Sequence, residues 1–233
     1  MVQAGAHVIV SARSETRLQE LASELGNATV LPMDVTDATS VERAAQTVGP
    51  IDGVIYNAGA YEPMHTQEWD SQAALTILDV NFSGALRILG HVVPKFTANN
   101  QGDITLIGSL AGYRGLPSAI GYGASKAALI SLAETMRQDL KESGVTVRIV
   151  NPGFIKTRLT EKNSFAMPQL MSPEVAAKHV VKAMRHNRFR TDFPHPFHGC
   201  SKHFTCYLTG SSIAEGRRTA GLKFGKIAVT TAA

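Results

Sequence analysis

Short apolar runs rich in valine and isoleucine alternate with helix-like segments over residues 6–190, and this alternation constrains the fold more than any other feature. Runs that are apolar throughout indicate strands buried on both faces. Such strands, separated by helices, predict a parallel sheet with helices on both sides. We therefore expect a doubly wound α/β domain of Rossmann type, with ligand sites at the carboxyl ends of its strands.

The pattern places the elements as follows. Strands are expected at residues 6–10, 29–33, 53–56, 104–108 and 145–150. Helices are expected at residues 15–25, 39–48, 71–96, 122–143 and 173–184. The strands end near Arg13, Asp34, Asn57, Ser109 and Asn151, and right-handed crossovers bring these ends to one edge of the sheet.

Composition narrows the class of protein. A chain of 233 residues with 44% hydrophobic and 18% charged residues is typical of one soluble globular domain. No apolar run predicts a membrane span, and the cysteines lie only near the C-terminus, so we expect a cytoplasmic protein. The net charge of +4 arises after residue 194, which argues against a nucleic-acid partner for the body of the chain.

Tyr122 and Lys126 stand four residues apart at the start of an expected helix and therefore share a face. A tyrosine hydroxyl has an ordinary pKa of about 10, and a nearby ammonium group lowers it. The pair can serve as a general acid and base for an alcohol or a ketone. The same spacing also occurs on ordinary helix surfaces, so the pair alone does not indicate chemistry.

Polar residues elsewhere strengthen the interpretation. Ser109 ends a strand, where its hydroxyl can bind a substrate oxygen, and small residues follow Asn57 at the end of another. Asn81 lies within a helix, where asparagine is a mediocre choice; it is either a buried amide bonded to the backbone or a water-holding amide. The sequence Asn151-Pro152-Gly153 is by itself a turn signal.

Taken together, these motifs resemble the short-chain dehydrogenase/reductase family over roughly residues 3–193. The resemblance implies a catalytic tetrad of Asn81, Ser109, Tyr122 and Lys126. It gives Tyr122 the proton exchange with the substrate oxygen and Ser109 the stabilisation of that oxygen. Lys126 would lower the pKa of Tyr122 and hold the nicotinamide ribose, and Asn81 would hold the water of a proton relay.

The same resemblance implies a site for a nicotinamide cofactor. Its members besides Tyr122 and Lys126 are Asp34, Val35, Asn57, Ala58, Gly59, Pro152, Gly153, Ile155 and Thr157. Tyr56 stands where the family motif has its first asparagine. Arg13 and Ser14 follow an expected strand with no acidic residue, which favours NADP over NAD, although a solvated arginine at a helix start is the alternative.

The substrate and the assembly are less sharply defined. Residues 154–171 are rich in apolar side chains and resemble the lid of the family. They suit an apolar alcohol or carbonyl substrate, or they only cover the core. The helices expected at residues 71–96 and 122–143 resemble those that relatives pair across a two-fold axis, so a homodimer or homotetramer is expected.

The sequence departs from the family at its start. A strand and a glycine-rich turn precede the stretch matched by residues 6–10 in the family, and neither stands in front of it here. We therefore expect the first strand to be missing, its neighbours to lack partners, and NADPH to bind very weakly or not at all. Either the true start lies upstream of Met1, which we favour, or the chain is a non-functional fragment. The alternative function is that of a catalytically silent relative that binds a ligand or partner.

The end of the chain is unusual as well. Residues 1–193 are expected to form the dehydrogenase domain and residues 194–233 an atypical tail, either disordered or the product of a reading-frame slip. The tail groups possible metal donors: His195, His198, Cys200, His203 and Cys206. Their spacing matches no usual zinc pattern, so no metal site is expected.

Overall fold

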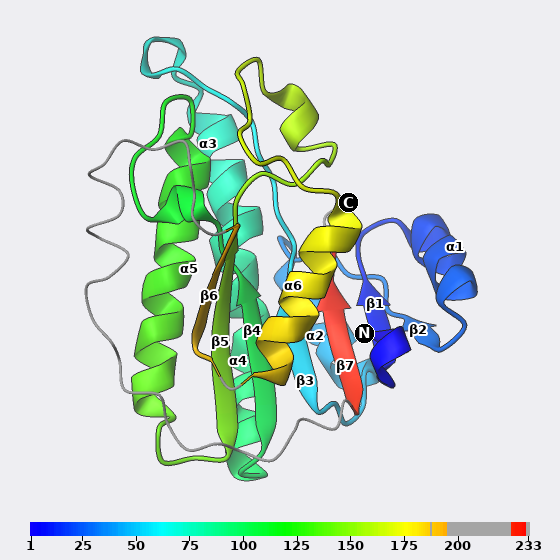
Figure 1. The fold of residues 1–233 in the computed structure, drawn as a ribbon. Coiled ribbons are helices and arrows are strands. Elements are labelled where there is room, and N and C mark those ends of the chain that lie inside the picture. The colour runs from blue at the N-terminus through cyan, green and yellow to red at the C-terminus, as the bar shows by residue number, and fades with distance from the viewer. Residues whose placement is uncertain (187, 195–224, 232–233) are drawn as a thin grey trace.

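A sheet of seven parallel strands forms the centre of the computed structural model, which describes residues 1–186, 188–194 and 225–231 (Figure 1). The strand order is β2-β1-β7-β3-β4-β5-β6. The strands are β1 His7–Ser11, β2 Ala28–Val30, β3 Gly53–Tyr56, β4 Gly102–Ile107, β5 Val145–Pro152, β6 Arg190–Phe193 and β7 Lys226–Thr230. The predicted parallel sheet is confirmed.

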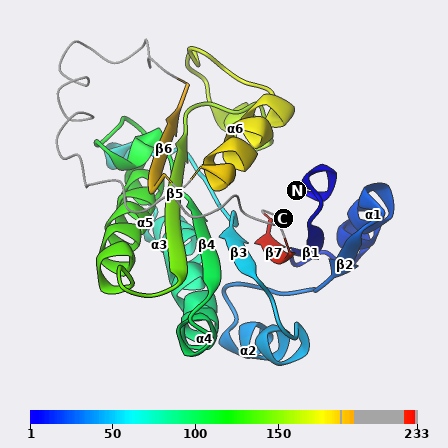
Figure 2. The same cartoon turned by 60° about the horizontal axis from the view of Figure 1, so that its bottom comes forward.

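Helices cover both faces of this sheet (Figure 2). They are α1 Glu15–Leu25, α2 Ala38–Thr47, α3 Ser71–Leu78, α4 Gly84–Ala98, α5 Ile120–Asp139 and α6 Pro173–Arg185. One apolar core joins the sheet to α2, α4 and α5, through residues such as Val41, Ile88 and Leu129. Two smaller cores join the opposite face to α1 and α6, through Leu18, Met184 and Ala183. The doubly wound architecture follows directly from these layers.

The helices α1, α2, α3 and α6 begin where the sequence supplies a capping side chain, whereas α4 and α5 begin without one. Ser14, Asp37, Asp70 and Ser172 each accept a hydrogen bond from a backbone amide in the first turn of α1, α2, α3 and α6 respectively. Gly26 ends α1 with a positive φ of 71°, a conformation that glycine adopts without steric cost. Local sequence therefore fixes where these four helices begin.

Strand β7 corrects the prediction that the strands on either side of the missing first strand lack partners. It lies between β1 and β3, with Val8 opposite Ile227 and Ile55 opposite Val229. Buried backbone groups without partners cost about 1–3 kcal/mol each, and β7 satisfies those of both neighbours. The tail predicted for residues 194–233 thus contributes the central strand, while its cluster of histidines and cysteines lies outside the described residues.

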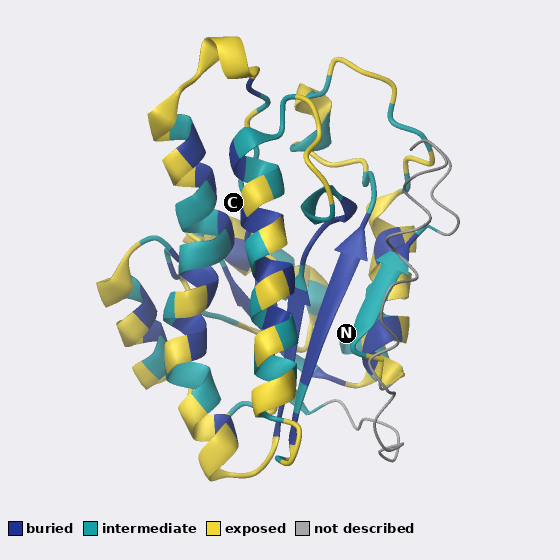
Figure 3. Cartoon of the chain, turned by 90° about the vertical axis from the view of Figure 1, so that its left-hand side faces the viewer, coloured by how far each residue is buried: buried dark blue, intermediate teal, exposed yellow. Residues whose placement is uncertain are grey.

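A nearly continuous helical region runs from Ser71 to Ala98, with a π-helical turn at Asp79–Ser83 between α3 and α4. Within the described residues this is the one stretch long and apolar enough to be a candidate membrane span by length and composition. Its buried and exposed residues alternate along the helix (Figure 3), and Ala74, Ile77 and Ile88 are buried. This alternation is typical of a helix that packs on a core.

Candidate active site

Two cavities adjoin each other beside the carboxyl ends of the strands. The first, of about 450 Å³, is lined by residues at the ends of β1 and β3 and by part of α3. The second, of about 510 Å³, is lined by residues after β4, by the start of α5 and by the segment after β5. Tyr61 and Leu159 line both cavities. The two cavities therefore share part of their walls.

Ser109 and Tyr122 meet in the wall of the second cavity. Ser109 is the second residue after β4. Its hydroxyl caps the short turn that follows by accepting a hydrogen bond from the amide of Ala111 at 3.1 Å. Tyr122 lies in the first turn of α5 and lines the same cavity wall as Ser109, whose side chain influences its pKa. The ring of Tyr61 packs edge-on against Tyr122, with centroids 5.1 Å apart. Two hydroxyls thus face a largely apolar chamber together.

The protonation of Tyr122 and Lys126 is governed mainly by burial. Desolvation raises the pKa of Tyr122, while the hydrogen bond with Ser109 acts in the opposite direction. Burial lowers the pKa of Lys126 to about 8. The Lys126 ammonium donates to the carbonyl of Ile107 at 2.8 Å and lies 5.7 Å from the Tyr122 ring centroid. That Lys126 lowers the pKa of Tyr122 remains a prediction.

Asn81 is fully buried in the π-helical turn between α3 and α4. Its amide donates to the carbonyl of Ala60 at 3.0 Å and to the hydroxyl of Ser125 at 2.9 Å, and its oxygen accepts from the amide of Ala60 at 2.6 Å. These bonds connect the α3–α4 region to the segment after β3 and to α5. Asn81 is therefore a buried amide bonded to the backbone and to Ser125, which lies one turn after Tyr122 on α5. That Asn81 holds the water of a proton relay remains a prediction.

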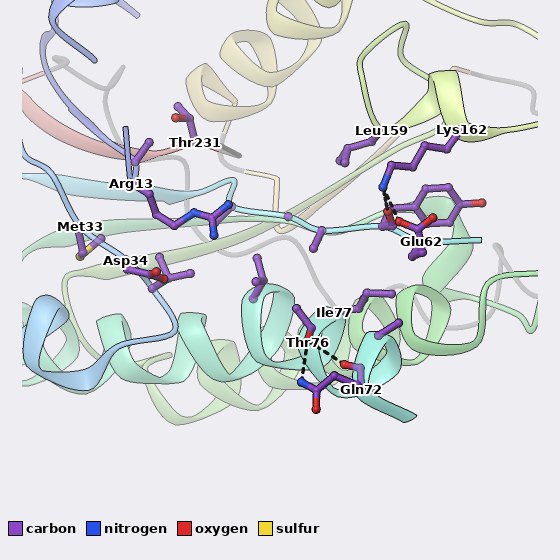
Figure 4. Close-up of a pocket in the computed structure, with 18 of the residues that line it drawn as sticks. Arg13, Met33, Asp34, Glu62, Gln72, Thr76, Ile77, Leu159, Lys162 and Thr231 are labelled. Carbon is purple, nitrogen blue, oxygen red and sulfur yellow. Dashed lines mark hydrogen bonds and ion pairs between the residues drawn. The ribbon is translucent and has the colours of Figure 1, made fainter. Parts of the chain in front are cut away.

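The first cavity contains five of the residues expected to hold a cofactor (Figure 4): Arg13, Asp34, Val35, Ala58 and Gly59. Burial opposes ionisation of Asp34, but hydrogen bonds from Thr36 and the neighbouring Arg13 and Arg87 outweigh it, so the pKa of Asp34 lies below its ordinary value. An ionised carboxylate and a guanidinium group thus lie at one end of this cavity.

Other residues expected to bind the cofactor line neither cavity, and most of them contact neighbours in the chain instead. The hydroxyl of Ser14 caps α1, because the free amides of a first helical turn need an acceptor. Thr157 accepts from and donates to Thr160, and Ile155 forms an isolated bridge with Met171. Asn57 is exposed, and Pro152 ends β5. Gly153, in contrast, lines the second cavity.

Two threonines that the sequence analysis missed reach the first cavity or its rim. The Thr230 hydroxyl oxygen accepts from the amides of Asn57 and Ala58 at 3.0 and 3.3 Å. Thr231 lines the cavity, and its amide donates to the carbonyl of Ser11 at 2.8 Å. The one available signal was the apolar run of residues 227–229, which resembles the other strands.

A polar cluster behind the second cavity was also missed. The Asn151 amide donates to Tyr113 and to Asp192 at 2.8 Å each, and the Tyr113 hydroxyl donates to Asp192 at 2.7 Å. Burial, followed by the charge of Asp192, raises the pKa of Tyr113. Since Tyr113 follows the turn capped by Ser109, the cluster ties that turn to the ends of β5 and β6.

The segment after β5 covers the second cavity as the sequence suggested. Phe154 and Phe165 pack at 5.9 Å between ring centroids, and both line the cavity. The segment is fastened to the loop after β3 at two points: Tyr61 donates to Asn163 at 2.8 Å, and Lys162 forms an ion pair with Glu62. Within the described part of the chain, no group of three or more histidine, cysteine, aspartate or glutamate side chains is placed to hold a metal ion.

Comparison with known proteins agrees with this arrangement. Residues 1–167 match the family model of the short chain dehydrogenases. An uncharacterized oxidoreductase of Myxococcus xanthus is 33% identical over 202 residues, which cover 83% of this chain and 80% of that protein.

Solved structures give the same result. A short chain dehydrogenase/reductase family protein superposes with a TM-score of 0.73 at 29% identity, over 78% of this chain and 80% of the other. Serine dehydrogenase from Escherichia coli superposes with a TM-score of 0.71 at 25% identity, over 82% of this chain and 88% of the other. The chain therefore belongs to the short-chain dehydrogenase/reductase family of oxidoreductases.

Proposed function

We propose that the protein transfers hydride between NADP(H) and an alcohol or carbonyl substrate. The observation that carries the proposal is that Ser109 and Tyr122 line the same wall of an apolar cavity, with Lys126 buried behind it. The first cavity adjoins this one, at the strand ends where parallel sheets of this type bind dinucleotides.

The chain's own residues divide the acid–base work. In carbonyl reduction Tyr122 donates its proton to the substrate oxygen, and Ser109 donates a hydrogen bond to the same oxygen. Lys126, as a cation, favours the phenolate that Tyr122 leaves behind. Asn81 fixes the backbone of Ala60 beside the site. A bound nicotinamide supplies or accepts the hydride, which is the cofactor's own chemistry.

A dinucleotide phosphate fits the polar groups of the first cavity. Arg13 is exposed there, and the hydroxyl of Ser11 is buried with no hydrogen-bond partner. No acidic residue stands at positions 11–13 to repel a 2′-phosphate. These features favour NADP over NAD.

The second cavity suits an apolar substrate without a formal charge. Among its described lining residues there is no aspartate, glutamate, lysine or arginine, and Leu116, Phe154 and Phe165 contribute apolar surface. Tyr61 and His65 are polar groups that can orient a substrate near Tyr122. We infer an apolar alcohol or ketone as the substrate class.

Substitution of Tyr122 by phenylalanine tests the proposed chemistry. It removes only the hydroxyl, so carbonyl reduction should fall about 10²- to 10⁴-fold, the usual contribution of a general acid. The affinity for NADPH, measured by fluorescence titration, should stay within about twofold. Unchanged turnover in the variant would show that Tyr122 is not the proton donor. Cofactor binding without turnover of any carbonyl or alcohol by the unmodified chain would favour a catalytically silent relative.

We also propose a homodimer or homotetramer in the cytoplasm. On α3 and α4, Leu75 is 61% and Leu86 44% exposed, whereas Leu129 of α5 is completely buried in the core. A second copy of the chain is the partner that would cover the exposed leucines. Light scattering at micromolar concentration should give a multiple of the mass of one chain, and a monomeric mass would contradict this proposal.

A further inference from the structure

The C-terminal strand joins the two halves of the sheet. Five residues of β7 pair with β1 on one side, and four pair with β3 on the other, all in parallel register. Its side chains serve both layers, because Ile227 packs in the core beneath α1 and α6 while Ala228 packs against the core beneath α2, α4 and α5. The ends of β1 and β3, which carry the cofactor residues, are thus held together through β7.

Specific contacts hold β7 in this place. The amide of Lys226 donates to the Asp52 carboxylate at 2.5 Å, and the amide of Asp52 donates back to the carbonyl of Lys226 at 2.7 Å. The Lys226 ammonium donates to the carbonyl of Val48 at 3.1 Å. A Cβ atom on Gly225 would collide with the Asp52 carboxylate, so a larger residue there would displace the acceptor of the Lys226 amide. The register of β7 is therefore set at its first residues by side chains as well as by apolar burial.

The last residue of β7 organises the turn after β3. Thr230 is 3% exposed, and its hydroxyl oxygen takes the amide hydrogens of Asn57 and Ala58, which lie beyond the last pair of the β3 ladder. A buried amide without an acceptor is costly. Thr230 thereby fixes the backbone that presents Ala58 and Gly59 to the first cavity.

The residue after β7 lines the same cavity, next to the end of β1. Thr231 lines the cavity with Ser11 and Arg13 (Figure 4), and both its amide and its hydroxyl contact the carbonyl of Ser11, at 2.8 and 3.4 Å. The hydroxyl of Ser11, buried and without a partner, is a donor that awaits an acceptor. Hydroxyls beside a guanidinium group suit a phosphate.

We infer that the C-terminal segment, residues 226–231, is a working part of the dinucleotide site: Thr230 positions the turn after β3, and Thr231, with Ser11 and Arg13, binds a phosphate of the cofactor. The inference rests on the proposed use of NADP(H). It differs from the expectation drawn from the sequence alone, in which no group replaces the glycine-rich turn and NADPH binds very weakly or not at all.

Valine substitutions test each threonine without changing its shape much. Titration calorimetry with NADPH and with NADH should show about tenfold weaker binding for Thr230→Val, since one to two hydrogen bonds are lost. Thr230→Ser, which keeps the hydroxyl, should restore most of the affinity. Thr231→Val should weaken binding about fivefold. An equal loss for both nucleotides assigns the contact to the shared pyrophosphate, and a loss for NADPH alone assigns it to the 2′-phosphate.

Thr191→Val is the matched control, because it removes a buried hydroxyl without a partner from β6 of the same sheet. It should leave both affinities unchanged. Failure of the unmodified chain to bind NADPH, or unchanged affinity in both Thr230→Val and Thr231→Val, would overturn the inference. Turnover of the unmodified chain at saturating NADPH is measured separately. If the chain turns over substrate but the threonine variants bind NADPH with unchanged affinity, only this inference is refuted. If the chain binds NADPH but does not turn over substrate, only the proposed function is refuted.

Discussion

The two cavities of the site are built from the chain in different ways. The catalytic cavity is lined by three segments in the middle of the chain: the loop after β3, the stretch from Ser109 to Tyr122, and the segment after β5. The cofactor cavity combines residues 11–80 with Leu159 and Lys162 and with Thr231 near the end of the chain. The cofactor cavity therefore depends, unlike the catalytic cavity, on one distant strand that must find its place between β1 and β3.

The largest effect is expected from a substitution that disrupts β7. Ile227 is 2% exposed in the core beneath α1 and α6, so Ile227→Asp buries a carboxylate there. We expect a loss of at least about 3 kcal/mol in the free energy of unfolding, a large part of a typical stability of about 5–15 kcal/mol. Urea denaturation measures this loss, and NADPH binding should disappear with it.

Val175→Asp provides the control for that experiment. Val175 is 43% exposed in the first turn of α6, where a carboxylate interacts favourably with the helix dipole. Its stability and NADPH affinity should match those of the unmodified chain. Equal stability of the Ile227→Asp and Val175→Asp variants would show that β7 is not needed by the sheet.

A smaller effect concerns pH and the catalytic cavity alone. Burial lowers the pKa of Lys126 to about 8, so this side chain is charged below that pH and neutral above it. Loss of the charge makes Tyr122 a weaker acid, so carbonyl reduction should decline as the pH rises through about 8. Lys126→Arg keeps its charge to much higher pH. Its kcat profile should lack the decline near pH 8, and the same decline in both proteins would exclude Lys126 as its cause.

The smallest effect concerns cofactor choice. Arg13 is exposed at the cofactor cavity, so its removal should not alter stability measurably. Arg13→Ala should weaken NADPH binding about tenfold and leave NADH binding almost unchanged, because only NADPH carries the 2′-phosphate. Parallel titrations with both nucleotides measure the ratio. Equal losses for the two would place Arg13 at a group that they share.

The sequence predicted the sheet, the helical layers and the residues of the catalytic cavity wall. The apolar runs predicted the sheet and both helical layers, and the spacing between Ser109 and Tyr122 placed both in one cavity wall because the turn between β4 and α5 is local. Ser14 was expected at the cofactor site, which stays a prediction; in the structure its hydroxyl caps α1, because serine is also a preferred residue at helix starts.

The place of β7 in the sheet could not be predicted from local sequence patterns. Thr230 contacts Asn57 across 173 positions of the chain, and no local pattern encodes such a pairing. An apolar run as short as that of β7 has no periodicity that separates a central strand from a stretch of tail. The buried partnerships of Asn81 and Asn151 were likewise set by neighbours distant in sequence.

Hydrogen–deuterium exchange of the full chain tests directly whether β7 completes the sheet, without any cofactor. If it does, the amides of residues 226–230 should exchange as slowly as those of β4, and the amides of β1 and β3 should be protected to a similar degree. Rapid exchange of residues 226–230, together with weak protection of β1 on the side that faces β7, would contradict the account.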